Sequence, residues 1–144
     1  MKHITVILFL ATALGFLIPD RAWSADFNKG EQAFYDKDYA AALREFVPLA
    51  EQGNKHAQIS LGIMHQHGLG VPMDHKNAAD FYHLALENGA TMGLTLLGQL
   101  MLDPASVMYN SKRGIILIRL AAKSGDVAAQ ILIKRNTELF ASAP

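Results

Sequence analysis

The sequence predicts an all-α fold: an α-solenoid (right-handed superhelix) of three antiparallel helix pairs followed by a C-terminal capping helix. The first observation is a fixed spacing, because Gly53, Gly89 and Gly125 lie 36 residues apart. The second is that apolar residues between these glycines recur with the period of an α-helix. A repeat of this length in a helical pattern indicates stacked helix pairs, each of which buries its apolar face against its neighbours.

The N-terminal residues 1–24 have the pattern of a signal peptide. Lys2 and His3 precede an uncharged run over residues 4–18, and a small-x-small site ends at Ser24. We expect cleavage after Ser24, with cleavage after Ala25 as the alternative, and export to the periplasm or, alternatively, secretion. A retained membrane anchor is the other interpretation, but the run of 15 residues is short against the roughly 20 that a spanning helix needs.

Residues 25–144 are expected to form one repeat domain, with units at about 27–53, 54–89 and 90–125 and a cap at 126–140. The chain has 13 basic and 13 acidic side chains, and removing residues 1–24 leaves 11 and 12. Because the cations are scattered, nothing indicates a nucleic-acid partner. The chain has no cysteine, so helix packing alone must stabilise it.

The first unit begins with a short helix from Phe27 that ends at the polar break of residues 36–38. Asp38 is an acceptable N-cap for a second helix over residues 39–52. Pro48 lies inside this helix and should bend it, at a cost of about 3 kcal/mol that packing must offset. Gly53 then supplies the left-handed geometry of a helix C-cap.

The second unit repeats this plan with a longer connector. Its first helix presents one apolar face and ends at Gly68 and Gly70, and Asp74 caps its second helix. Gly62 and Gly98 occupy equivalent places where helices are expected to approach closely. Positions that form the two apolar stripes are Ala57, Leu61, Met64 and His65 in the first helix, and Ala78, Phe81, Tyr82, Ala85 and Leu86 in the second.

The third unit keeps the spacing but has Ser106 where the second unit has Gly70, so we expect a remodelled connector. Both of its helices are apolar on more than one side, which is typical of a unit covered by neighbours. We therefore expect Ile116 and Leu120 to be buried between units, with an exposed patch for a partner or a second copy as the alternative. A final helix over residues 126–140 provides the cover.

The central unit resembles the Sel-like repeat, a 36-residue relative of the tetratricopeptide repeat. The resemblance implies an α-solenoid that binds proteins or peptides on its concave side without a cofactor. Two departures are His65, where the family usually has tyrosine, and Phe81, where it usually has tryptophan. The residues that match are Ala57, Leu61, Gly62, Met64, Gly68, Gly70, Val71, Asp74, Ala78, Tyr82, Ala85 and Gly89.

Neither a metal site nor an active site can be assembled from the sequence. The histidines at 56, 65, 67, 75 and 83 include no pair with the i, i+4 spacing of a helical metal site. His65 is better interpreted as a residue at the edge of the core. No serine has histidine and aspartate at a recognisable spacing, so we expect no enzyme. The alternative is a small exported enzyme of the β-lactamase-like class found among cysteine-rich repeat relatives.

These observations predict an exported, monomeric scaffold that binds a protein or peptide of unknown identity. The first helix of each pair lines the concave side in tetratricopeptide-like stacks, so residues off its core stripe are candidates for contact with a partner. Ile59 and Ile63 could instead pack against an adjacent helix. The candidate partner-binding residues are Ile59, Ile63, Gln66 and His67, with Thr95, Gln99, Leu102 and Asp103 one repeat later.

Overall fold

The computed structural model describes residues 25–141, and every regular element in this range is an α-helix. The predicted signal peptide, residues 1–24, lies outside the described residues. The helices of the described range are α2 (Phe27–Tyr35), α3 (Tyr39–Glu51), α4 (Lys55–His67), α5 (His75–Glu87), α6 (Met92–Leu102), α7 (Ser111–Lys123), α8 (Val127–Arg135) and α9 (Thr137–Ala141).

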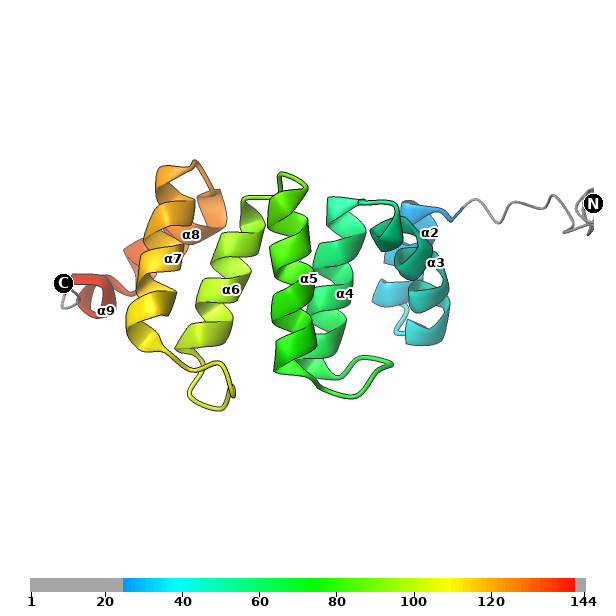
Figure 1. The fold of residues 1–144 in the computed structure, drawn as a ribbon, viewed down its shortest axis with the longest axis horizontal. Helices are drawn as coiled ribbons and strands as arrows, with labels where there is room; N and C mark the ends of the chain where they lie inside the picture. The colour runs from blue at the N-terminus through cyan, green and yellow to red at the C-terminus, as the bar shows by residue number, and fades with distance from the viewer. Residues whose placement is uncertain (1–24, 142–144) are drawn as a thin grey trace, which may run out of the picture.

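The helices form pairs that stack in chain order into an elongated row (Figure 1). Within each unit α2 packs on α3, α4 on α5 and α6 on α7, and the second helix of each unit contacts the first helix of the next. Helix α8 continues this order by packing against α7 and touching α6. The predicted all-α solenoid of three helix pairs with a C-terminal cap is therefore confirmed.

Each second helix starts with the same hydrogen bond. The side chains of Asp38, Asp74 and Asn110, which are 36 residues apart, each accept a hydrogen bond from the backbone N–H three residues later. An oxygen in this position satisfies one of the N–H groups that a helix leaves without an internal partner. The repeat is thus present in the capping chemistry as well as in the spacing of apolar residues.

The three spaced glycines end the same helices. Gly53, Gly89 and Gly125 have φ angles of +84°, +84° and +91°, a conformation that side chains with a Cβ rarely adopt. The N–H of the residue after each glycine donates to the carbonyl five residues earlier. This hydrogen bond is the one that closes a left-handed helix terminus. It turns the chain by the same geometry at every junction between units.

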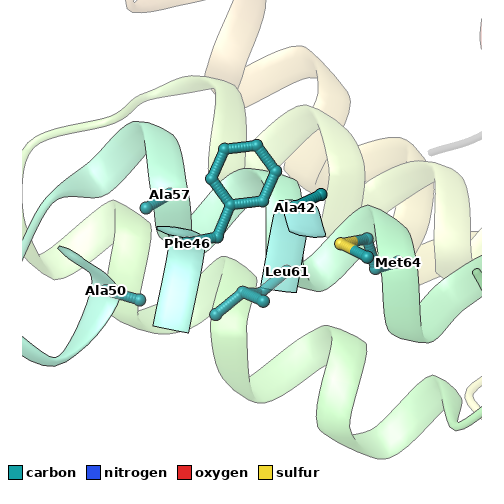
Figure 2. Packing of buried hydrophobic residues seen from close by; sticks show 6 residues of the cluster. All are labelled: Ala42, Phe46, Ala50, Ala57, Leu61 and Met64. Carbon is teal, nitrogen blue, oxygen red and sulfur yellow. The ribbon is translucent and has the colours of Figure 1, made fainter. Parts of the chain in front are cut away.

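The core follows the seams between helices. Figure 2 shows the seam between the first two units, in which Phe46 from α3 lies above Leu61 from α4. Small residues let the helices approach here, since Ala42 and Ala57 are fully buried. A polar link crosses the same seam, because the buried Gln58 donates to the carbonyl of Ala50 at 3.0 Å. The oxygen of the same amide accepts a hydrogen bond from Asn88 at 3.1 Å, which joins it to the end of α5.

The connector of the third unit is remodelled, as predicted. In the second unit Gly68 and Gly70 have positive φ angles, whereas the only described residue other than glycine with a positive φ is Lys37. Ser106 is instead buried, and its hydroxyl accepts a hydrogen bond from the N–H of Met108 at 3.1 Å. The two connectors still end with equivalent hydrogen bonds. The backbone N–H of Asp74 donates to the carbonyl of His65, and that of Asn110 donates to the carbonyl of Met101.

Two expectations about the C-terminal part are corrected. The single helix expected over 126–140 is divided at Asn136, whose side-chain amide and backbone N–H both donate to carbonyls at the end of α8. Phe140 then turns inward and is buried. The expected burial of Ile116 and Leu120 is wrong, since these side chains are 57% and 48% exposed. They lie on the outer side of α7, where no further helix of the described chain covers them.

Candidate binding groove on the first helices

A groove of about 380 Å³ opens on the layer formed by the first helices of the units. It lies between α2 and α4, and the start of α6 contributes Met92. The groove has a mainly apolar lining with three polar side chains, which is typical of sites that bind an organic ligand or a peptide side chain. The lining residues are Phe27, Glu31, Phe34, Tyr35, Phe46, His56, Ile59, Ser60, Ile63 and Met92.

Helical periodicity places these residues together. The lining residues of α2 are residues 27, 31, 34 and 35, and those of α4 are residues 56, 59, 60 and 63. The α2 set follows the spacing i, i+4, i+7, i+8 and the α4 set the spacing i, i+3, i+4, i+7, and each spacing marks one helix face. Phe46 is the exception, because it belongs to the second helix α3 and is almost fully buried. It therefore forms part of the floor of the groove.

Aromatic rings in the groove contact one another in two places. The ring of Phe27 lies 5.5 Å from that of Phe46 and 5.9 Å from the imidazole of His56, measured between centroids. Further along α2, the rings of Phe34 and Tyr35 are 6.1 Å apart and nearly perpendicular. Tyr35 is 74% exposed, so its ring stands at the open rim. Contacts of this kind fix ring orientation.

Two acidic side chains lie near the groove in different environments. Glu45 is buried, and its carboxylate accepts a hydrogen bond of 2.8 Å from the backbone N–H of Asp26. Glu31 is half-buried and lines the groove directly. The carboxylate of Glu45 is therefore engaged in holding the start of α2, whereas that of Glu31 faces the space a ligand would occupy.

Half of the candidates predicted on α4 lie in the groove. Ile59 and Ile63 line it, although Ile59 is largely buried and also packs beside Ala90. Gln66 accepts a hydrogen bond of 2.6 Å from the hydroxyl of Tyr82 and so supports the pairing of α4 with α5. His67 is exposed at the end of the helix.

The candidates on α6 lie outside the groove and do not form one surface with the residues of α4. Thr95 is 2% exposed, and its hydroxyl donates to the carboxylate of Asp126 at the start of α8. Leu102 packs against Gly114 in the core of the third unit. Gln99 and Asp103 are exposed. Thr95, the equivalent of Ile59, is thus held by the start of α8, and Leu102 is held by α7.

Sequence reasoning missed the aromatic residues of α2 as site residues. The sequence predicts a short first helix from Phe27 to the break at residues 36–38, and no binding role is assigned to it. The available signal was the spacing of residues 27, 31, 34 and 35, which puts three rings and one carboxylate on a single helix face.

The described residues also bear on the metal and membrane questions. No group of three or more potential ligands (His, Asp or Glu) in residues 25–141 is arranged to hold a metal ion. No helix in that range is long and apolar enough to cross a bilayer. His65 is half-buried and stacks on Phe81 with centroids 5.4 Å apart, as expected for a residue at the core edge. Its Nδ1 atom is buried without a hydrogen-bond partner.

Parts of the chain are similar to known repeat proteins. No family model matches the sequence. The chain is 32% identical over 59 residues to the "ERAD-associated E3 ubiquitin-protein ligase component HRD3A" of Arabidopsis thaliana, which covers 41% of this chain and 9% of that protein. It is 28% identical to "Protein sel-1 homolog 2" of Mus musculus and 30% identical to the protein of the same name of Rattus norvegicus. Each of these matches runs over 78 residues and covers 54% of this chain and 11% of the relative. The matched residues thus span about a tenth of each relative.

A solved structure shares the fold. The "Crystal structure of Sel1 repeat protein from Oxalobacter formigenes" superposes with a TM-score of 0.65, at 23% identity, over 75% of this chain and 44% of that one. Together, the matched relatives and this structural neighbour support the Sel1-like repeat family for this chain. Within the described residues, the central unit carries the repeat pattern most fully, and its glycines at 62, 68, 70 and 89 each occupy a close approach or a left-handed turn.

Proposed function

We propose that this Sel1-like repeat protein is a binding scaffold, and that the groove between α2 and α4 holds a segment of a partner protein or peptide. The observation that supports this most directly is the groove itself. It combines an apolar floor with an open rim at Tyr35 and Met92, and it lies on the helices that face a ligand in repeat stacks. Large exposed apolar side chains around a hollow indicate an interaction surface.

The relatives support the same class of function. The Arabidopsis relative is described as a component of a ubiquitin-protein ligase, which is a role within an assembly of proteins. We infer binding rather than catalysis for the present chain. An assay of β-lactam hydrolysis addresses the enzymatic alternative, because a scaffold should show no turnover above a buffer control.

We also propose that the scaffold works after export, with residues 1–24 acting as a cleaved signal peptide. The support is the sequence pattern alone: a basic start, an uncharged run and a small-x-small site. The periplasm is the proposed compartment, and secretion is the alternative.

Site-specific photo-crosslinking in the native host tests the binding function. A photoreactive amino acid replaces Ser60, which lines the groove. In a matched control it replaces Asp80, which is exposed on the second helix α5. We expect a discrete crosslinked partner from position 60 and none from position 80. Equal crosslinking from both positions, or none from position 60, would contradict the assignment of the groove.

A captured partner then permits a quantitative test. Ile63→Glu places a charge in the apolar groove, and Gln99→Ala removes an exposed amide one repeat further on. The double variant should bind at least about tenfold more weakly, equivalent to about 1.4 kcal/mol, while its circular dichroism spectrum stays helical. Because Gln99 lies outside the groove, Ile63→Glu alone should account for most of the loss.

A further inference from the structure

The groove between α2 and α4 combines aromatic rings with a single carboxylate, and this combination has a specific chemistry. We infer that it receives a cationic side chain, an arginine or a lysine, from the bound partner segment. This inference rests on the proposed binding function and adds the chemical class of the group that is recognised. Three features of the described residues carry it: the rings, the carboxylate and the absence of lysine and arginine from the lining.

The rings supply attractive surfaces for a cation. Phe27, Phe34, Tyr35 and Phe46 all line the groove. Phe27 is tilted by 40° against Phe46, and Phe34 meets Tyr35 at 82°, so ring faces and ring edges point in several directions around the hollow. A guanidinium or ammonium group within about 6 Å of a ring centre is attracted to its face. A purely aliphatic ligand would gain nothing from this arrangement beyond burial.

Glu31 supplies the opposite charge. It lies one helical turn from Phe27 on one side and from Phe34 and Tyr35 on the other, and all four residues line the groove. Within the part of the chain that the structure describes, no cation pairs with it. Half-burial strengthens an ion pair relative to one in free solvent, and an arginine can bind a carboxylate through two N–H groups at once.

The lining contains no lysine or arginine that would repel a cation. Lys29 is the nearest cation in the sequence of α2, but it lies two residues from Glu31 and is exposed on another side of the helix. His56 is the one basic side chain in the lining, and it packs against the ring of Phe27. The other end of the groove, formed by Ile59, Ile63 and Met92, suits an aliphatic side chain beside the cation.

Two blocked peptides that differ at one position test the inference. The probes are acetyl-Leu-Arg-Leu-Leu-amide and the same peptide with norleucine, a neutral side chain, in place of arginine. Each is titrated into the isotopically labelled full chain, and amide shifts in α2 and α4 give the Kd. The arginine peptide should bind at least about fivefold more tightly, as expected for a cation held by rings and a carboxylate. This preference should weaken in 1 M salt.

Two variants separate the role of Glu31 from the effect of the protein's net charge. Glu31→Gln keeps the size of the side chain and should reduce the preference for arginine to less than about twofold, because the rings alone remain. Glu51→Gln is the matched control, since Glu51 is an exposed glutamate at the end of α3 outside the groove. It should leave the preference unchanged. The amide spectrum of each variant shows whether it is folded.

The outcomes distinguish this inference from the binding function. If both peptides shift α2 and α4 with equal affinity, the cation inference is overturned and the groove remains a binding site. If neither peptide shifts the amide signals of these helices, the inference is also overturned. The binding function is then tested independently by crosslinking from position 60. A preference for arginine that survives Glu31→Gln would overturn the role of the carboxylate.

Discussion

Gly62 of α4 lies directly against the ring of Tyr82 in α5, so closely that a Cβ on residue 62 would be 2.6 Å from Cδ1 of the tyrosine. The same relationship recurs in the other units. A Cβ on Gly98 would lie 2.5 Å from Cγ1 of Ile118, and one on Gly30 would lie 2.5 Å from Cε1 of Phe46. Each helix pair is therefore closed by a glycine on the first helix and a large buried side chain on the second.

Gly98→Leu should destabilise the protein. Besides Ile118, the added side chain would meet the carbonyl oxygen of Gly114 at 2.9 Å, and backbone cannot move aside cheaply. We expect a loss of at least the roughly 1 to 3 kcal/mol typical of overpacking, seen as a lower melting temperature. Gln99→Leu is the control, because it adds leucine at the next, exposed position of α6. An unchanged melting temperature for Gly98→Leu would contradict the close crossing.

The free energy of unfolding should fall at alkaline pH because of the buried hydroxyl of Tyr82. Burial raises the pKa of its hydroxyl above the usual value near 10. The folded state then keeps a proton that the unfolded chain loses, so this contribution is fully present below about pH 10 and falls as the pH rises further.

Tyr82→Phe tests this dependence by denaturant unfolding at about pH 8 and about pH 10.5. At the lower pH the variant should be less stable by about 1 kcal/mol, because the hydrogen bond to Gln66 is lost. At the higher pH this difference should shrink, since the variant has no phenol to ionise. A difference that is the same at both pH values would count against the proposed linkage.

Thr95→Val should loosen the attachment of α8. The hydroxyl of Thr95 donates to the carboxylate of Asp126, which also caps α8 by accepting from the N–H of Ala128. Valine keeps the volume and removes the donor, at an expected cost of about 1 to 3 kcal/mol. Hydrogen exchange over residues 126–141 should therefore accelerate more than in α4. Thr91→Val is the control, because Thr91 is exposed and makes no capping bond; equal acceleration in both variants would exclude the role of the hydroxyl.

The mature protein should begin at Ala25 when it is isolated from an exported fraction. The small-x-small site ending at Ser24 predicts this cleavage, and Asp26 is the alternative first residue. Intact mass spectrometry reads the N-terminus directly. An exported chain that still begins at Met1 would contradict the signal-peptide assignment.

Sequence alone predicted the stacking order because the repeat appears in residues with specific backbone requirements. Gly53, Gly89 and Gly125 each need a left-handed conformation, and Asp38 and Asp74 each cap a helix. These requirements are local, so they can be read from neighbouring residues. The break at Asn136 could not be read in this way, because the helical period continues past it and only competing hydrogen bonds end α8.

The errors about exposure have a different cause. Apolar character predicted burial of Ile116, yet its equivalent one repeat earlier is the exposed Asp80, so the position faces outward in both units. Conversely, Thr95 was expected on the surface, but α8 lies over it. The groove likewise depends on how helices that are distant in the sequence pack together. The spacing of α2 residues shows that Phe27, Phe34 and Tyr35 share a face, but not that α4 stands opposite them at a distance that leaves a hollow.

The repeated junctions make the 36-residue block interchangeable in principle, with one exception. A second copy of residues 54–89 inserted after Gly89 would restore the same turn and the same hydrogen bond at each new boundary. At the natural boundary, however, Gly93 sits where a Cβ would be 2.6 Å from the carbonyl oxygen of Tyr82. In the inserted copy, Ala57 would occupy that place. Lengthening the molecule by duplication therefore needs Ala57→Gly in the new block, which is a compatibility rule between adjacent modules.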